Sequence, residues 1–288
     1  MSTSTVTRVG IVGGGIMGSG IAEVCARADL DVLLVEVDAA AAGRARERIE
    51  RSMQRAARRG KLEPDALQRA LESLHTASDL GDLRDRDVVI EAVVEEKATK
   101  LSVFRALGEI MPPEAILASN TSSIPIVDLA VATGNRSSQV LGMHFFNPVP
   151  VLALVEIVPS LLTAEAVTAT ARAFVTGQLG KDPILAPDRA GFTVNALLIP
   201  YLLAAIRMFE QGLASAEDID MGMVKGCAHP MGPLALSDLI GLDTVMSVAE
   251  TLYAEHREQL YAPPPLLQRL VAAGLLGRKT GRGLYSYT

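Results

Sequence analysis

The sequence predicts an α/β protein with a doubly wound sheet and an inserted helical hairpin, followed by an all-α C-terminal domain. Two observations predict this class. Short β-branched runs alternate with helical stretches in the first part of the chain, and from about Gly191 the apolar residues follow helical spacing only. We place the boundary within Ala186–Arg189, which gives predicted domains of residues 1–187 and 188–288.

The chain opens with a strand, a helix and a second strand within about 30 residues. Val9–Val12 is a β-branched run closed by glycines and predicts a buried strand. Ile16–Ala28 has helical composition, and Asp31–Glu36 predicts the second strand. Such a β-α-β unit is typical of the start of a doubly wound sheet.

The stretch Ala39–Leu74 interrupts the alternation of strands and helices. It is rich in alanine and arginine, has helical spacing and is broken near Gly60 and Pro64, so we expect a helical hairpin there. Four further strands are expected, with helices between the earlier ones, at Asp87–Glu91, Ala115–Ala118, Gln139–Phe145 and Leu152–Val158.

Helices account for the C-terminal part of the sequence. The first is expected from Val194 to Phe209, with a kink at Pro200. Ser215 and Asp218 have the spacing of a capping box that opens a second helix. Two more helices are expected at Asp243–His256 and Pro265–Ala273.

Composition narrows the possible functions. The net charge is −6, so neither nucleic acid nor an anionic membrane surface is an expected partner. The most apolar stretch, Ala196–Ile206, is too short to cross a bilayer. The first residues lack the basic and apolar regions of a secretory signal. Cys25 and Cys227 lack CxxC spacing, so we expect two reduced thiols in a cytoplasmic protein.

A glycine-rich turn follows the first predicted strand. Its pattern is Gly13-x-Gly15-x-x-Gly18, with Ile16 and Met17 at the start of the helix. Glycines allow a tight turn and the close approach of a pyrophosphate to the helix N-terminus. Because a strand precedes the turn and a helix follows it, the pattern predicts a Rossmann-type dinucleotide site rather than glycines that serve packing alone.

Glu36 ends the second predicted strand. A carboxylate at this place accepts hydrogen bonds from both hydroxyls of the adenine ribose. It also repels a 2′-phosphate, and neither Val37 nor Asp38 offers a cation, so NAD is favoured over NADP. Arg44 and Arg46 lie further along the next helix, and a contact from either of them to a 2′-phosphate would weaken that preference.

A histidine and a glutamate lie on two apolar strands that are joined by the turn Asn147–Pro150. His144 lies near the end of the first strand and Glu156 lies deep in the second. A buried carboxylate needs a compensating partner, and His144 is the nearest polar candidate. Alcohol oxidation by hydride transfer needs a group that exchanges a proton near neutral pH, which an imidazole does. A core histidine without function is the alternative.

The remaining polar candidates do not form a recognised site. His75, His229 and His256 have no metal-ligand spacing, so no metal is expected. Ser122 lies outside any GxSxG elbow, and this argues against a serine hydrolase.

The chain contains several short motifs, each of them once, in a particular order. They are Gly13–Gly18, Ser119–Ser123, His144–Pro148, Glu156, Gly191–Asn195, Pro230–Pro233 and Lys279–Gly283. Together they resemble the L-3-hydroxyacyl-CoA dehydrogenase family, and within it the stand-alone 3-hydroxybutyryl-CoA dehydrogenases. The resemblance covers essentially the whole chain. It implies hydride transfer between NAD(H) and a (3S)-3-hydroxyacyl-CoA, with acetoacetyl-CoA as the first candidate for the keto substrate.

The resemblance also implies roles for individual residues. His144 would be the general acid or base, with Glu156 as its partner. Ser122 and Asn195 would hold the 3-oxygen and the thioester, and Ser122 would also meet the cofactor. Asn147 would lie beside the nicotinamide or the substrate.

Further positions match family contacts to the cofactor or to CoA. Glu95 and Lys100 match dinucleotide contacts, and Ser52 on the hairpin matches a contact to CoA. Where a hairpin lysine is expected, this chain has Arg59, which can pair with a phosphate in bidentate fashion. The family often has aspartate where this chain has Glu36, so the reach toward the ribose differs.

The hairpin gives a separate reason to expect CoA, because it concentrates positive charge in an acidic chain. Its cations are Arg44, Arg46, Arg48, Arg51, Arg55, Arg58, Arg59 and Lys61. A solvated helical face is the simpler explanation of such a run. A dehydrogenase of a non-CoA hydroxy acid would not need this charge, and a dinucleotide-binding protein without catalysis would not need His144 and Glu156.

A homodimer through the C-terminal domain is also expected. The domain carries more apolar residues than one helical layer requires. The predicted interface consists of Leu234, Leu236, Leu239, Ile240 and Leu242.

Overall fold

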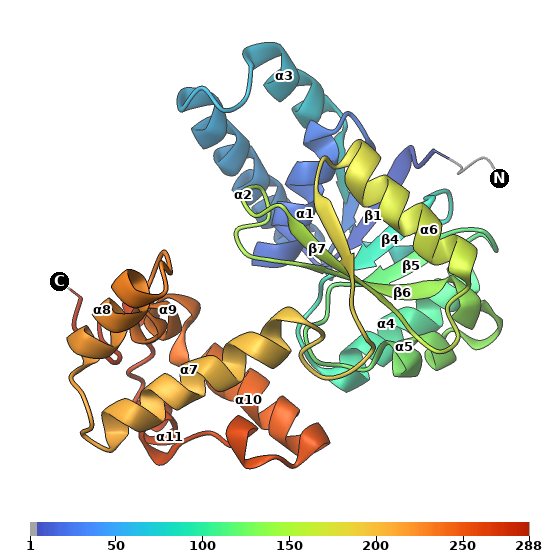
Figure 1. Cartoon of the computed structure of the whole chain (residues 1–288). Helices are drawn as coiled ribbons and strands as arrows, with labels where there is room; N and C mark the ends of the chain where they lie inside the picture. The colour runs from blue at the N-terminus through green and yellow to red at the C-terminus, as the bar shows by residue number, and fades with distance from the viewer. Residues whose placement is uncertain (1–4, 288) are drawn as a thin grey trace. The chain divides into compact units, whose positions relative to one another are not determined.

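An eight-stranded sheet organises the N-terminal part of the chain (Figure 1). The computed structural model describes residues 5–287, so most of the segment on which the expectation about a secretory signal depends lies outside the described residues. The strands are β1 (Arg8–Val12), β2 (Asp31–Val35), β3 (Leu74–Ala77), β4 (Val88–Glu91), β5 (Ile116–Ser119), β6 (Val140–Phe145), β7 (Leu154–Pro159) and β8 (Asp182–Leu185).

The strand order across the sheet is β3-β2-β1-β4-β5-β6-β7-β8. Neighbouring strands from β3 to β6 are parallel, β7 is antiparallel to β6, and β8 is parallel to β7. The first six strands have the order of a Rossmann-type sheet. The predicted fold class is therefore confirmed.

Helices cover both faces of the sheet (Figure 1). One face carries α1 (Ile16–Arg27) and α6 (Glu165–Ala173), and the other carries α4 (Lys97–Ile110) and α5 (Ile126–Ala132). The strands between the two helical layers are buried, as all residues of β4, β5 and β6 show. Burial on both faces explains why the sequence shows continuous apolar runs instead of an alternating pattern.

The predicted hairpin consists of α2 (Ala39–Arg58) and α3 (Pro64–Glu72), which lie beside each other (Figure 1). Asp38 caps α2 by accepting a hydrogen bond from the Ala41 N–H. The buried face of α2 consists of Ala42, Ala45, Ile49 and Met53. The hairpin is slightly shorter than expected, because Leu74 already belongs to β3.

Two strands, β3 and β8, lie outside the strand ranges that the sequence predicted, although a strand was expected to start near His75. Each has four residues and lies at an edge of the sheet. Edge strands are only partly covered, so neither segment has the apolar pattern of a buried strand. Pro183 lies within β8, where an edge position tolerates the missing N–H.

The chain divides into two compact units, one up to Asp188 and the other from Arg189. The second unit contains α7 (Val194–Glu210), α8 (Ala216–Gly226), α9 (Pro233–Ile240), α10 (Leu242–His256) and α11 (Pro265–Ala272). The helix α7 continues through Pro200, and Ser215 caps α8 by accepting a hydrogen bond from the Asp218 N–H. Among residues 5–287, no helix has both the length and the apolar composition needed to span a membrane.

The apolar residues predicted to form a subunit interface lie mostly in the core of the second unit. Leu234 and Leu242 are fully buried, because α9 and the start of α10 turn this side inward. Leu236 and Ile240 are partly buried against the same core, and only Leu239 is exposed, at 49%. The prediction is therefore wrong for Leu234 and Leu242, and for the other three residues it stays a prediction. The exposed large apolar side chains of the unit also include Leu197, Met208, Leu213, Met221 and Leu260.

Candidate active site

The glycine-rich turn connects the carboxyl end of β1 to α1. Gly13 has a φ of +94°, and a Cβ on Gly18 would lie 1.8 Å from the Gly13 carbonyl oxygen, so the turn closes only with glycine at both positions. Gly15 is different, because a Cβ there would meet no protein atom within 4 Å. Packing within the chain does not explain a glycine at this position. The close approach of a ligand's phosphates would explain it.

The N-terminal end of α1 suits an anion. Gly15 is the N-cap residue, and no side chain caps the helix. The first backbone N–H groups of a helix have no partner within the helix, and the helix dipole favours negative charge at this end. Ile16 lies here with 69% of its surface exposed. The turn therefore fits the pyrophosphate of a dinucleotide.

Glu36 follows β2 and contacts the same turn. Its Oε1 accepts a hydrogen bond from the Gly14 N–H at 2.7 Å, and its Oε2 accepts one from the Val37 N–H at 3.1 Å. A carboxylate accepts about four hydrogen bonds, so capacity remains for two ribose hydroxyls. Val37 is 86% exposed beside this carboxylate and offers an apolar surface to a base.

The side chain of Arg46 binds groups of the hairpin and of β3. Its guanidinium pairs with Glu50 at 2.8 Å and donates hydrogen bonds to the carbonyl oxygens of Leu71 and Leu74. These bonds join α2 to the end of α3 and to β3. Arg46 is therefore not available as the cation that would bind a 2′-phosphate.

His144 and Glu156 lie directly opposite each other on the antiparallel strands β6 and β7. The Nδ1 of His144 is 2.8 Å from Oε2 of Glu156. Glu156 has no exposed surface and His144 is 7% exposed. Opposite residues in such a pair point to the same face of the sheet, which explains how the chain reversal between the strands brings the two side chains together. The Phe146 ring lies edge-on to the imidazole, with 4.6 Å between centroids.

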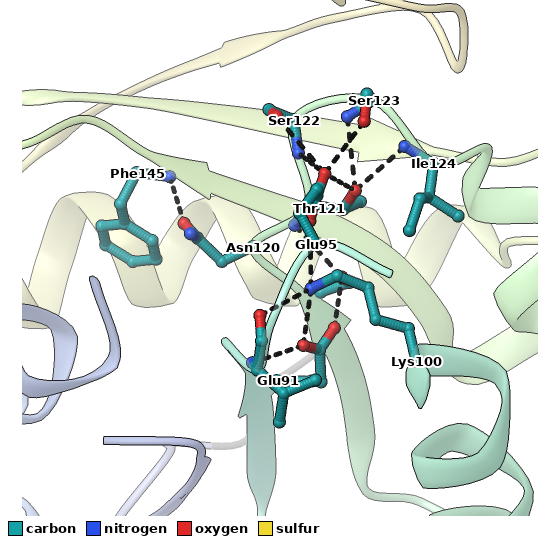
Figure 2. Close-up of polar contacts among 11 residues, drawn as sticks. Glu91, Glu95, Lys100, Asn120, Thr121, Ser122, Ser123, Ile124 and Phe145 are labelled. Atoms are coloured by element: carbon teal, nitrogen blue, oxygen red, sulfur yellow. Dashed lines mark hydrogen bonds and ion pairs between the residues drawn. The ribbon is translucent and has the colours of Figure 1, made fainter. Parts of the chain in front are cut away.

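Lys100 joins two carboxylates near the carboxyl end of β4 (Figure 2). Its Nζ lies 2.6 Å from Oε1 of Glu91 and 3.2 Å from Oε2 of Glu95. Glu91 and Lys100 are both buried. The ammonium group is thus held by the protein, and we expect any effect of Lys100 on a dinucleotide to pass through Glu95.

Glu95 binds the loop that follows β5 and carries Ser122 (Figure 2). Its Oε1 accepts hydrogen bonds from the Ser122 N–H at 2.8 Å and from the hydroxyl groups of Thr121 and Ser123. Burial raises the pKa of Glu95, but the charge of Lys100 and these hydrogen bonds outweigh burial and hold the pKa below its usual value. An ionised carboxylate therefore fixes the loop at neutral pH.

Asn120 connects the same loop to β6, the strand that carries His144. Its Oδ1 accepts a hydrogen bond from the backbone N–H of Phe145 at 2.8 Å (Figure 2). Phe145 follows His144 in β6. A chain of contacts thus leads from Lys100 through Glu95 and the loop after β5 to β6.

The other predicted site residues are distributed over both units. Ser52 lies partly buried on α2, and Arg59 is the exposed C-cap residue of that helix. Asn147 is exposed in the loop after β6. Asn195 is the second residue of α7 in the second unit. Within residues 5–287, no group of three or more His, Cys, Asp and Glu side chains is arranged to hold a metal ion.

Sequence reasoning missed Glu91 and Lys181. Glu91 is the last residue of the buried strand β4, and Glu36 directly follows the strand β2. An acidic residue at the end of a buried strand was the sequence signal that could have identified Glu91. Lys181 is buried, and its Nζ donates hydrogen bonds to the carbonyl oxygens of Val149 at 2.7 Å and Leu152 at 2.6 Å. These bonds hold the connection between β6 and β7. A single lysine before an edge strand gives no signal of this contact, because the partners are backbone atoms about 30 residues earlier.

Family models match both parts of the chain. The NAD binding domain of 3-hydroxyacyl-CoA dehydrogenase matches residues 8–189, and the C-terminal domain of 3-hydroxyacyl-CoA dehydrogenase matches residues 191–287. The chain belongs to the 3-hydroxyacyl-CoA dehydrogenase family. The resemblance seen in the sequence motifs is therefore confirmed, and the sheet with its glycine-rich turn belongs to the NAD-binding domain of this family.

Individual proteins and solved structures are similar to this chain over their full length. A 3-hydroxybutyryl-CoA dehydrogenase of Mycobacterium tuberculosis is 52% identical over 99% of this chain and 100% of that protein. The crystal structure of (S)-3-hydroxybutyryl-CoA dehydrogenase from Ralstonia eutropha has a TM-score of 0.94 and 44% identity, over 99% of this chain and 100% of that one. A solved diketoreductase, described with dicarbonyl compounds, has a TM-score of 0.86 and 29% identity over 99% and 100%.

Proposed function

We propose that the protein interconverts (3S)-3-hydroxybutyryl-CoA and acetoacetyl-CoA, with NAD(H) as the hydride carrier. The observation that carries this proposal is the buried pair of His144 and Glu156 in the NAD-binding domain of a dehydrogenase family. Full-length similarity to 3-hydroxybutyryl-CoA dehydrogenases supports the choice of substrate.

His144 moves the proton in the proposed reaction. Bound NAD supplies the acceptor for the hydride that leaves C3 of the substrate. Because the Nδ1–H of His144 is donated to Glu156, the hydroxyl proton is taken by Nε2. The carboxylate of Glu156 fixes the tautomer and stabilises the imidazolium that forms. In the reverse direction, His144 returns the proton to the 3-keto oxygen.

Three polar side chains are proposed to hold the reacting part of the substrate. Ser122 donates its hydroxyl to the 3-oxygen in place of the hydrogen bond that this hydroxyl donates to Glu95 at 3.3 Å, and Glu95 keeps hold of the Ser122 backbone N–H. Asn195 holds the thioester, and Asn147 lies beside the substrate or the nicotinamide. Polar groups positioned in advance stabilise charge that develops on the oxygen during the reaction.

The hairpin is proposed to bind CoA. Ser52 on α2 matches a family contact to this part of the substrate, and Arg59 at the C-cap of α2 stands where the resemblance implies a lysine that contacts CoA. Arg59 is exposed and suits the charge of a phosphate. Arg46 does not contribute, because Glu50 and backbone carbonyls occupy its guanidinium.

NAD is the proposed cofactor, in preference to NADP. Glu36 is tied to the turn by its hydrogen bonds to Gly14 and Val37, so its charge stays where a 2′-phosphate would lie. The guanidinium of Arg46 is occupied elsewhere. A difference of about 1.4 kcal/mol corresponds to a tenfold preference, so even modest repulsion produces clear discrimination.

Steady-state kinetics with purified protein test the proposal. NADH consumption is measured with acetoacetyl-CoA and with free acetoacetate, and the first is repeated with NADPH. We expect kcat/KM to be at least about a hundredfold higher for the CoA ester, and at least about tenfold higher with NADH. Equal or better turnover of free acetoacetate would support a dehydrogenase of a non-CoA acid. NADH binding without turnover of any acyl-CoA would indicate a protein without catalysis.

A further inference from the structure

The peptide between Gly14 and Gly15 lies in the middle of the glycine-rich turn, and side chains fix it. The carbonyl oxygen of Gly14 accepts a hydrogen bond from the Ser19 Oγ at 2.8 Å and another from Nη1 of Arg48. On the preceding side, the Gly14 N–H donates to Glu36. The two peptide planes that meet at Gly14 are therefore both held by polar side chains.

Arg48 reaches this turn from the hairpin and not from the core of the dinucleotide fold. It lies on α2, three residues after Ala45, and positions three apart share one helix face. Ala45 packs so tightly on the turn that a Cβ on Gly14 would lie 2.4 Å from the Ala45 Cβ. The face of α2 that carries Ala45 and Arg48 therefore forms a wall of the glycine-rich turn.

The other contacts of the hairpin arginines set Arg48 apart. Arg46 binds Glu50 and the backbone near β3, while Arg51 pairs with Glu47 at 3.4 Å on the surface. Within the described chain, Arg48 is the hairpin arginine whose hydrogen bonds join the turn.

The orientation of one peptide plane links this contact to the cofactor. The Gly14 carbonyl and the Gly15 N–H belong to the same planar peptide and point to opposite sides of it. Holding the carbonyl on the side of Arg48 therefore aims the Gly15 N–H away from Arg48. Gly15 is the N-cap residue of α1, where a pyrophosphate binds in this type of fold. A carbonyl turned the other way would face the negative phosphates.

We propose that Arg48 is a positioning residue for the dinucleotide, which holds the Gly14–Gly15 peptide in the orientation that binds the pyrophosphate. A charged donor makes a stronger bond to this carbonyl than the Ser19 hydroxyl does. The proposal requires the NAD-binding domain of the family, but it does not depend on the substrate named above. Its test therefore measures NADH binding without any acyl-CoA.

Direct fluorescence titration with NADH tests the role of Arg48. Arg48→Met should raise the Kd of NADH about fivefold to twentyfold, and Arg48→Lys, which keeps the charge and a donor, should stay within about threefold of wild type. Where turnover is measurable, Arg48→Met should raise the KM of NADH by the same factor and leave kcat within about twofold. A role in folding alone would lower the melting temperature without this selective change.

Arg51→Met is the matched control, because it removes the same charge from the same helix without touching the turn. Its NADH affinity should equal that of wild type. Equal weakening in Arg48→Met and Arg51→Met would overturn the proposal in favour of a general field effect. A Kd for Arg48→Met within about twofold of wild type would also overturn it.

A second variant keeps the test valid if Arg48→Met folds poorly. Ser19→Ala removes the other donor to the Gly14 carbonyl and should also weaken NADH binding. Where Arg48→Met does fold, the two effects should be non-additive in the double variant, because both donors bind one oxygen. Strictly additive effects, or no effect of Ser19→Ala, would contradict a shared role at this peptide.

Discussion

Two carboxylates without exposed surface, Glu156 and Glu91, have partners of different chemistry. Glu156 binds the imidazole of His144, while Glu91 binds the ammonium of Lys100 and the hydroxyl of Ser119. An imidazole exchanges protons near neutral pH, whereas an ammonium group ordinarily does not. The pair of His144 and Glu156 can therefore take up and release a proton. The pair of Lys100 and Glu91 serves only to hold the side chains and strands around it in place.

The two cysteines provide a test of burial at the residue scale. Burial raises the pKa of Cys25 to about 12, although the charge of Lys181 opposes this shift, and Cys227 is exposed. Only a thiolate reacts readily. We expect a thiol reagent at pH 8 to modify one cysteine rapidly, and the second only after unfolding in urea. Two rapidly reacting thiols in the native protein would contradict the burial of Cys25.

At the scale of elements, the ion pair of Lys100 and Glu91 connects α4 to β4. Lys100→Met leaves Glu91 buried without its cation, which should lower the free energy of unfolding by about 3–5 kcal/mol. Lys97→Met is the control, because Lys97 lies on the same helix and forms an exposed pair with Asp128. It should cost less than about 1 kcal/mol. If a urea titration gave the same loss of unfolding free energy for both variants, the buried pair would contribute no more to stability than the exposed pair.

The depressed pKa of Glu95 predicts a dependence of stability on pH. A carboxyl group whose pKa is lower in the folded state stabilises the fold above its unfolded pKa, here 4.5, and loses this effect as the pH falls through the folded value. The advantage of wild type over Glu95→Gln in urea unfolding should therefore be full at pH 7 and decline below pH 4.5. A difference that stays constant from pH 7 to about pH 3 would contradict this account.

The strands that the sequence predicted are those buried on both faces, because burial leaves a continuous apolar run. The edge strands β3 and β8 have no such run, and they exist through pairing with β2 and β7. The contact of His144 with Glu156 could be predicted, because a short reversal between two apolar strands leaves a buried acid few partners. The contact of Lys181 with two carbonyl oxygens could not, since any backbone segment can serve as such a partner.

At the scale of the whole molecule, the residues of the expected subunit interface were the hardest feature to predict. An apolar residue on a helix packs either in its own domain or against another subunit, and the sequence pattern is the same for both. Leu234 and Leu242 belong to the first kind. Leu197 and Leu213 are 72% and 69% exposed and provide apolar surface on the same unit.

The homodimer remains a prediction for the intact chain. Light scattering during size-exclusion chromatography should give twice the chain mass at micromolar concentration. Association of this kind covers exposed apolar surface and should resist moderate salt. A mass equal to that of one chain across the same concentration range would overturn the prediction.

The proton-carrying role of His144 is the central claim, and turnover of His144→Gln tests it most directly. The variant should lower kcat for acetoacetyl-CoA reduction by about two to four orders of magnitude, because the amide cannot exchange the proton. The Kd of NADH, measured by fluorescence, should stay within about twofold of wild type, since the glycine-rich turn is untouched. Turnover equal to that of wild type would contradict the account and remove His144 from the reaction.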